Sequence, residues 1–421
     1  MRSRTSTVLI LVAVMAPPST SGAPPIGDAR LAAAGLTKFW TATVPLVPQD
    51  RVDAVYRVDD TVYVISRNGS IYSLQADVGL IRWAEKLAAP DSLIRKPIHF
   101  WTSRGDGPVG ILAGEGFFVL DRYSGDRLFH AVDELNLGGR LAAAGRSVFA
   151  GGLDGRVRSL KLLGNGGQEV LERWQIAVGS PVTAAPLLFG QQDILFAAQS
   201  GLVIACSAID KSFRWRFRAG GGVFGDPAVN GSGVYVAGMG GSLYKLDGRS
   251  GQLVWRVRFP GPLAEGPVAT SSRIYQHCDL NGLFCVDAAS GQKLWNLKSG
   301  KAFLAELPGR VAAQMSDGRL VLVDNQSGTI LAEFDAGEAV TAAENRYDDA
   351  IYLAYADGRV VSLRPSGSGY LTGAKAEAAR DRLRLPPTAA NRGESSASPS
   401  ASPPRADDSD VDILRSRRDK N

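Results

Sequence analysis

Apolar and polar positions alternate along most of this chain in short runs, without the 3.6-residue rhythm of helices. The stretch VYVAGMGGSLYKLDGRSGQLVWRV (234–257) shows the pattern. It contains a strand, a glycine turn, a second strand, an Asp-x-x-Ser-Gly turn and a third strand that carries a Trp. Gly-containing turns supply the positive φ that tight hairpins need. The pattern therefore predicts β-hairpins.

The same hairpin recurs along the chain. Its turn glycine reappears every 36 to 47 residues, at Gly69, Gly116, Gly155, Gly201, Gly241, Gly282, Gly318 and Gly358. Eight copies at that period suit a propeller in which each copy is one four-stranded blade. We therefore predict an all-β, eight-bladed β-propeller of antiparallel blades over residues 36–365, with seven blades as the alternative.

A large aromatic residue holds one position in the strand after the Asp-x-x-Ser-Gly turn. The position is filled by Trp83, Phe129, Trp174, Trp215, Trp255 and Trp295, and by Ala332 in the seventh copy. The eighth copy ends at 363–365 without this strand, whereas LTKFWTATVPL (36–46) carries Trp40 in the same pattern with no hairpin before it. We expect this N-terminal strand to complete the last blade, because an open ring would leave two unpaired edges.

These repeated residues are expected to be structural. A Trp fills the outer part of a wedge-shaped blade, and its indole N–H can donate to a carbonyl of the neighbouring unit. Asp247 and Asp287 are predicted to cap backbone N–H groups of their turns, while Gly251 and Gly291 take the left-handed position. A residue that recurs around a ring is usually one that every blade needs for packing.

Three segments, LYKLDGRSGQLVW (243–255), LFCVDAASGQKLW (283–295) and LVLVDNQSGTILA (320–332), resemble the quinoprotein-type (PQQ-like) propeller repeat LYALDxxTGxxxW. This resemblance implies the propeller fold and offers two functional branches. One is the dehydrogenases that carry pyrroloquinoline quinone and calcium in the central channel. The other is the non-catalytic propellers similar to the outer-membrane assembly factor BamB family, scaffolds that bind other envelope proteins.

The dehydrogenase branch implies a longer chain with a vicinal Cys pair that stacks on the quinone. This chain has three Cys, none adjacent, and no grouping of Asn, Asp or Glu spaced as a calcium site. We therefore expect a non-catalytic, monomeric scaffold with no cofactor, which binds protein partners in the cell envelope. The alternative is a quinone-dependent oxidoreductase or a small-ligand binder that uses the channel.

The ends of the chain differ from the middle. A basic start followed by the apolar run TVLILVAVMA (7–16) predicts a signal peptide over 1–23, which is too short for a transmembrane helix. No Cys precedes Cys206, so we expect an exported protein, periplasmic or secreted, that is not a lipoprotein. Residues 24–35 form a short lead. Residues 366–421 are rich in Ser, Ala and Pro and predict a disordered tail, with a short helix over 372–385.

The net charge of +5 is divided among the two ends and the propeller. No basic face is concentrated, which argues against a nucleic-acid partner. Acids and one Arg lie in segments before the first strand of several units and define a predicted partner-binding rim, with solvated loop charges as the plainer interpretation. The predicted rim consists of Arg51, Asp226, Glu265, Glu306 and Glu338.

Cysteine and histidine give the remaining candidates. Cys278 and Cys285 flank the Asn281-Gly282 turn, and a two-residue turn would place them opposite each other at disulfide distance. The other interpretation is two buried thiols. The histidines, His99, His130 and His277, are expected to be structural, since His130 and His277 fall in distant units.

Overall fold

The computed structural model describes residues 26–100, 107–132, 137, 139–163, 169–190, 192–231, 233–336 and 341–368. They belong to the first of two compact units, Met1–Arg384; the second, Leu385–Asn421, lies outside the described residues. The predicted signal peptide (1–23) and the predicted helix at 372–385 also lie outside them. Within the described residues, no helix is long and apolar enough to cross a membrane.

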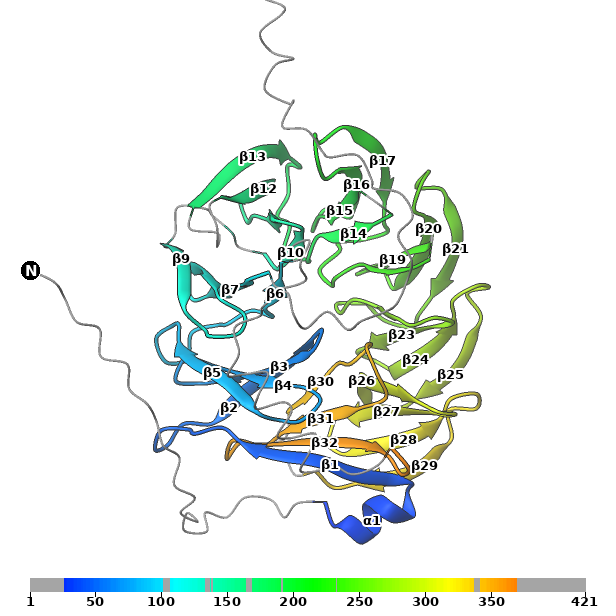
Figure 1. Cartoon of the computed structure of the whole chain (residues 1–421). Helices are drawn as coiled ribbons and strands as arrows, with labels where there is room; N and C mark the ends of the chain where they lie inside the picture. The colour runs from blue at the N-terminus through cyan, green and yellow to red at the C-terminus, as the bar shows by residue number, and fades with distance from the viewer. Residues whose placement is uncertain are drawn as a thin grey trace, which may run out of the picture. The chain divides into compact units, whose positions relative to one another are not determined.

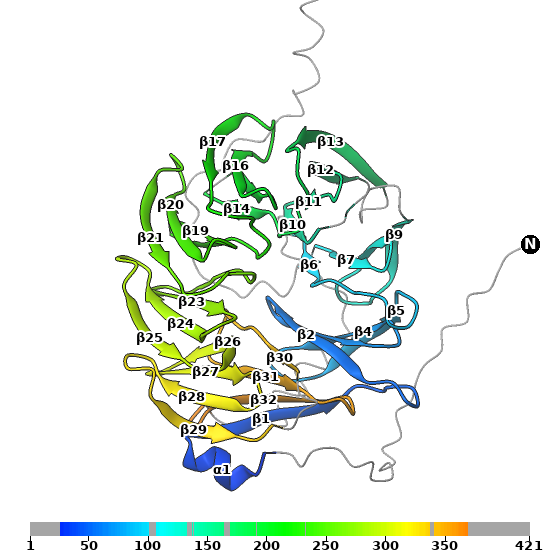
Figure 2. The ribbon, with the colours of Figure 1, turned by 180° about the vertical axis from the view of Figure 1, so that it is seen from behind.

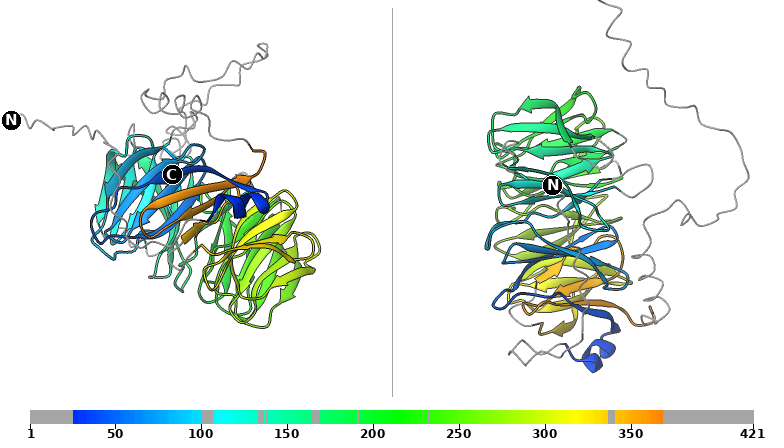
Figure 3. Two further views of the ribbon diagram at one scale, coloured as in Figure 1. Left: turned by 90° about the horizontal axis from the view of Figure 1, so that it is seen from below. Right: turned by 60° about the vertical axis from the view of Figure 1, so that its left-hand side comes forward.

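The described part of the first unit is a ring of eight four-stranded antiparallel sheets (Figure 1). Figure 2 shows the same ring from behind, and the two views of Figure 3 show the strands layered in successive blades. The predicted eight-bladed propeller is therefore confirmed, and the seven-bladed alternative is wrong. Each blade is named here by its order along the chain, from blade 1 to blade 8.

The first four blades follow one another in sequence. Blade 1 contains β2 (Val52–Val58), β3 (Thr61–Ser66), β4 (Ser70–Gln75) and β5 (Ile81–Lys86). Blade 2 contains β6 (Ile98–His99), β7 (Val109–Ala113), β8 (Gly116–Leu120) and β9 (Arg127–Val132). Blade 3 contains β10 (Leu141–Ala144), β11 (Ser147–Gly151), β12 (Arg156–Leu163) and β13 (Glu169–Ala177). Blade 4 contains β14 (Leu187–Phe189), β15 (Asp193–Ala197), β16 (Leu202–Ser207) and β17 (Phe213–Arg218).

The next three blades repeat this order and the last one closes the ring. Blade 5 contains β18 (Ala228–Asn230), β19 (Gly233–Gly238), β20 (Ser242–Asp247) and β21 (Leu253–Arg258). Blade 6 contains β22 (Val268–Ala269), β23 (Arg273–Cys278), β24 (Gly282–Asp287) and β25 (Lys293–Leu297). Blade 7 contains β26 (Gly300–Leu307), β27 (Arg310–Met315), β28 (Leu320–Asp324) and β29 (Ile330–Phe334). Blade 8 contains β30 (Thr341–Ala343), β31 (Ile351–Ala354), β32 (Arg359–Pro365) and β1 (Leu36–Thr43).

The N-terminal strand β1 closes blade 8, as predicted. It pairs antiparallel with β32, from Leu36 opposite Pro365 to Thr43 opposite Arg359. Trp40 lies in this strand opposite Ser362 and donates its indole N–H to the carbonyl of Ala76 in blade 1, at 2.9 Å. The closing strand therefore joins the last blade to the first through the same contact that the other blades use.

The repeated Trp and Gly meet across blade boundaries. The indole N–H of Trp215 in blade 4 donates to the carbonyl of Gly248 in blade 5 at 2.7 Å. A Cβ added to Gly251 would lie 2.5 Å from the ring of Trp215, and Gly251 has φ of 69°. The repeat glycine is thus required for two reasons, its backbone conformation and the flat ring pressed against it. Equivalent Trp-to-carbonyl hydrogen bonds are made by Trp40, Trp83, Trp255 and Trp295.

Blade 4 departs from this arrangement. Lys211, with φ of 56°, stands where other blades have the glycine, and its N–H donates to Ser207 as that of Gly251 donates to Asp247. The buried Nε1 of Trp174, in the preceding blade, has no hydrogen-bond partner among the described residues.

A short helix, α1 (Asp28–Ala33), fills the gap left by the missing aromatic residue of blade 7. Ala332 pairs with Leu322 directly before a register shift, the place that Trp255 takes opposite Lys245 in blade 5. Leu31 of α1 is fully buried in the apolar cluster against which Ala332 packs. Figures 1 and 2 both show α1 beside β1 and β29. Residues 24–35 were predicted only as a lead, so this helix was missed.

Every outer strand carries a register shift against its neighbour. The shift falls at the equivalent place in all eight blades, for example between Lys245 and Leu246 in β20. Such bulges twist a strand and interrupt its regular pairing pattern. The exposed edge of each blade is consequently a poor template for adding strands from another molecule.

The predicted turn glycines adopt positive φ in seven of the eight hairpins, with Gly116 as the exception. Gly116 begins β8 and pairs with Ala113, and the left-handed residue of that hairpin is Gly114, with φ of 57°. The predicted turn glycine of blade 2, Gly116, is therefore two residues away from Gly114, the glycine that the turn requires.

The cysteine pairing predicted from the turn is wrong. Cys278 pairs with Gly282 and Cys285 with Tyr275, so the turn is longer than the assumed two residues and both thiols stay free. Cys278 packs in the apolar cluster between blades 5 and 6, whereas Cys285 packs in the cluster between blades 6 and 7. Burial raises the pKa of Cys206 to about 11 and that of Cys285 to about 12. These thiols are therefore core residues.

Candidate functional site: the loop face and central cavity

One face of the ring is built from two kinds of loop. The turns between second and third strands meet the loops that lead from one blade to the next, as in the hydrogen bonds from Leu87 N to Gly69 O (3.0 Å) and from Phe259 N to Gly241 O (2.8 Å). In blade 5, Met239 N also donates to Gly222 O at 2.9 Å. We call this side the loop face.

A cavity of about 540 Å³ lies on the ring axis. Its lining comes from seven of the eight blades, which only a central position allows. The inter-blade loops provide much of the wall, including Leu93, Arg95, Lys96 and Arg140, so the cavity opens on the loop face. Its size lies in the range of about 300–1,000 Å³ that small-molecule and side-chain pockets occupy.

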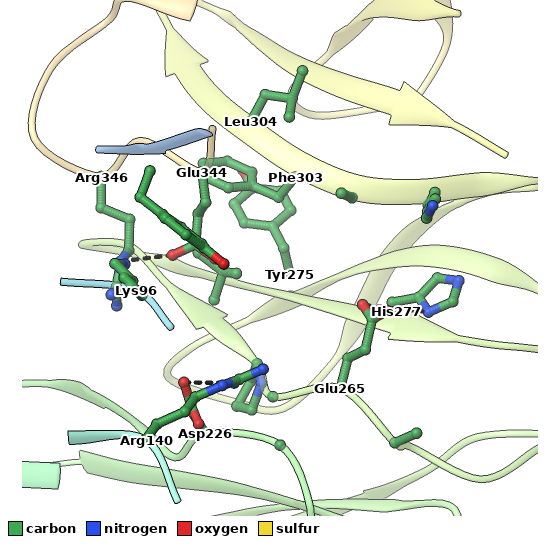
Figure 4. Close-up of a pocket in the computed structure, with 18 of the residues that line it drawn as sticks. Lys96, Arg140, Asp226, Glu265, Tyr275, His277, Phe303, Leu304, Glu344 and Arg346 are labelled. Atoms are coloured by element: carbon green, nitrogen blue, oxygen red, sulfur yellow. Dashed lines mark ion pairs between the residues drawn. The ribbon is translucent and has the colours of Figure 1, made fainter. Parts of the chain in front are cut away.

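Asp226 holds three blades together at this cavity. Its carboxylate lies 2.8 Å from the guanidinium of Arg140 in the entry to blade 3, and it accepts a 2.7 Å hydrogen bond from the N–H of Ala185 at the entry to blade 4. Figure 4 shows the ion pair at one side of the cavity. Burial acts against the charged form of Arg140, but Asp226 outweighs it and raises the pKa of Arg140.

A second ion pair lies near Lys96. Glu344 and Arg346, from the loop after β30, are joined at 3.0 Å, and Figure 4 shows Lys96 beside them. Burial lowers the pKa of Lys96, although Glu344 acts in the opposite direction. The ammonium group of Lys96 thus lies in partly desolvated surroundings, and no described residue forms an ion pair with it.

His277 lies on the other side of the cavity. Its Nδ1 is 3.6 Å from the carboxylates of both Glu265 and Asp279. Glu265 is also part of the cavity lining, whereas Asp279 belongs to the turn before β24. The cavity wall therefore carries charge of both signs from blades 2, 3, 5, 6, 7 and 8.

The predicted rim residues do not form one group. Asp226 and Glu265 line the central cavity, but Arg51 lies in a separate depression beside Asp50 and Arg67. Glu306 accepts hydrogen bonds from the hydroxyls of Tyr275 (2.7 Å) and Thr270 (2.9 Å). The remaining member, Glu338, lies outside the described residues.

The cavity cations were missed by the sequence argument. Arg95, Lys96 and Arg140 precede the first strands of blades 2 and 3, the same place in the repeat that identified Asp226 and Glu265. The signal was available, since these loops surround the channel in every blade. The predicted rim consisted mainly of acidic residues, so Arg95 and Lys96, which directly precede Pro97, were left out of it.

A different polar cluster lies at the far end of β2. Nδ1 of His99 is 2.8 Å from Asp59 and its Nε2 is 2.8 Å from the hydroxyl of Tyr63. A carboxylate only accepts, so Nδ1 donates to Asp59 and the neutral ring accepts from Tyr63. Burial lowers the pKa of His99, and burial also raises that of Tyr63. This chain of hydrogen bonds joins blades 1 and 2 inside the protein.

The described residues do not fit the calcium and quinone of the dehydrogenase branch. They contain no cluster of three or more His, Cys, Asp or Glu side chains that could hold a metal ion. The three cysteines are not adjacent in sequence and are buried within blades rather than in the cavity lining.

Several exposed apolar side chains belong to loops of the loop face. Leu280 at the turn of blade 6 is 69% exposed, and Leu93 beside the cavity is 55% exposed. Others of this kind on the same face are Val47, Leu153, Phe224 and Met239. Outside the loop face, further exposed apolar residues lie along the outer strands, including Leu253, Val254 and Leu331.

The fold and cavity define a β-propeller of PQQ-like repeats whose central cavity opens on one face. The family model for outer membrane protein assembly factor BamB matches residues 153–262 and 240–383, which together exceed half of the chain. The chain belongs to this family.

Solved structures agree on the fold. BamB from Moraxella catarrhalis is 19% identical, with a TM-score of 0.63, over 80% of this chain and 99% of that chain. The computationally designed Ika8 protein is 17% identical, with a TM-score of 0.58, over 75% of this chain and 96% of that chain. No curated protein sequence matches the chain.

Proposed function

We propose that this chain is an exported, non-catalytic propeller that binds protein partners in the cell envelope through its loop face. The observation that carries the proposal is the group of exposed apolar side chains on that face around a charged cavity. Exposed apolar side chains beside polar and charged residues are common at protein-binding sites. The family name, which describes an outer-membrane assembly factor, supports the same function.

The outer strands are the competing surface, because Val254 and Leu331 are also more than half exposed. These residues lie at or next to the register shifts of separate blades, one or two in each blade. Scattered exposed apolar residues are normal on proteins and need no partner. The loop face differs in combining such residues with the charged mouth of the cavity.

Site-specific photocrosslinking in intact host cells tests the proposal. A photoreactive amino acid would replace Met239 or Leu280 on the loop face, Val254 on an outer strand, or Ile209 in the turn before β17. We expect a discrete crosslinked partner from positions 239 and 280 and none from 254 or 209. The crosslinked chain should also fractionate with the cell envelope.

Two results would contradict the proposal. One is the absence of any crosslinked protein at positions 239 and 280. The other is crosslinking from position 254 alone, which would move the binding surface to the outer strands. Circular dichroism of each purified variant would establish that the blades are still formed.

A further inference from the structure

The cavity lining carries more positive than negative charge. It contains five cationic residues, Arg95, Lys96, Arg140, Lys301 and Arg346, and three carboxylates, Asp226, Glu265 and Glu344. Two of the carboxylates are engaged, Asp226 with Arg140 at 2.8 Å and Glu344 with Arg346 at 3.0 Å. No described residue forms an ion pair with Arg95, Lys96 or Lys301. These three cations are therefore available to pair with an anionic ligand in the cavity.

The surplus cations are not evenly placed. Arg95 and Lys96 are consecutive residues in the loop that enters blade 2, and both are only partly exposed. Lys96 lies beside the Glu344–Arg346 pair, as Figure 4 shows. Desolvation of an ammonium group disfavours its charged form, and burial lowers the pKa of Lys96 even though Glu344 acts in the opposite direction. An anionic group brought into this wall would remove that penalty.

The apolar part of the lining indicates what kind of anion fits. Leu93 and Phe224 are 55% and 41% exposed and border the cavity. Phe303 and Leu304 line it from blade 7. A ligand that fills this space has carboxylates for Arg95 and Lys96 and apolar groups for the other walls. The volume of about 540 Å³ admits a few side chains but no folded domain.

We propose that the central cavity binds an acidic, partly apolar peptide segment of the partner protein, with Arg95 and Lys96 contacting its carboxylates. This inference rests on the proposed function, because it extends the protein-binding loop face into the cavity that opens on it. Charge complementarity and the continuity of Leu93 and Phe224 with the loop face favour a peptide over a free small anion.

Fluorescence anisotropy with the full chain tests the proposal. The probe is a fluorescein-labelled peptide of alternating Glu and Phe, compared with the same peptide built from Gln and Phe. We expect only the Glu peptide to bind, with an affinity that falls as salt is added. Lys96→Gln and Arg95→Gln should each weaken binding by about tenfold, as expected for the loss of one charge-assisted contact. Lys161→Gln, an exposed lysine of β12 outside the cavity lining, is the matched control.

Three results would overturn the proposal: equal binding of the two peptides, equal loss of binding in Lys161→Gln, or tighter binding of citrate or inorganic phosphate than of the Glu peptide. The last would make the cavity a small-anion site. Repeating the photocrosslinking at Met239 in the Lys96→Gln background separates the two proposals. A crosslink of unchanged yield would contradict the proposed peptide binding in the cavity but would remain consistent with partner binding through the loop face.

Discussion

Gly251 and Trp215 show how a one-dimensional repeat becomes a contact between blades. The sequence predicted that Gly251 takes positive φ and that the Trp is structural, because both recur at a fixed spacing. It did not predict that the Trp of one blade lies on the glycine of the next, with 2.5 Å between the ring and a Cβ added there. The repeat pattern shows which residues recur within each blade, whereas this contact joins residues of two neighbouring blades.

Gly251→Ala should therefore cost more than the left-handed backbone alone explains. Gly309, with φ of 71°, has no atom within 4 Å of an added Cβ and serves as the matched control. Gly309→Ala should lower the free energy of unfolding by about 1–2 kcal/mol, the cost of the backbone conformation. Gly251→Ala should lower it by about 2–4 kcal/mol, because overpacking adds to that cost. Urea denaturation measures both, and equal losses would contradict the ring contact.

At the scale of elements, the strands could be predicted directly from the sequence, whereas helix α1 could not. Alternating apolar residues and Gly turns located the hairpins, and the unpaired Trp40 strand identified the closure. Helix α1 escaped because DARLAA is too short for a periodic signal and its partner, Ala332, was recognised only as an absent aromatic residue. What fills a gap in one blade can come from any part of the chain.

Leu31→Ala tests the role of α1 as that filler. Leu31 is fully buried against blades 7 and 8, so its truncation should lower the free energy of unfolding by about 2–5 kcal/mol. Arg30→Ala, an exposed position on the same helix, should change it by less than about 0.5 kcal/mol. Thermal and urea unfolding give both values. A loss as small as that of Arg30→Ala would show that α1 does not support the ring.

At the scale of the whole molecule, the ring of eight blades could be predicted from the sequence, whereas the lining of the central cavity could not. Eight copies and one displaced strand define the propeller, because each copy needs neighbours on both sides to bury its faces. The cavity combines single side chains from seven blades, such as Arg140 and Asp226, which pair across blade 4. These charges differ from blade to blade, so the repeat itself does not identify them, and the cations were missed although they precede the first strands of their blades as Asp226 and Glu265 do.

A circular permutant tests whether closure depends only on pairing. Gly367 and Asp28 line the same depression beside α1, so a short linker can join the chain after β32 to α1 and retain both α1 and β1, with new ends between Val47 and Pro48 in the exposed loop before β2. We expect the permutant to keep the far-ultraviolet spectrum and to unfold at a temperature equal to or above that of the parent chain. Failure of the permutant to fold, beside a folded parent that also lacks the residues before 26 and after 368, would show that closure requires the original connectivity.

The closing pair also determines when the ring can be completed. β1 is the first strand of the propeller to be synthesised, and β32, its partner, is the last. Until β32 has been synthesised, the strand that carries Trp40 has no partner strand in blade 8, although the other seven blades can already form. Contacts between such distant segments form slowly and leave unpaired strands exposed to aggregation. The growing chain is therefore most prone to aggregation in the interval before its final strand appears.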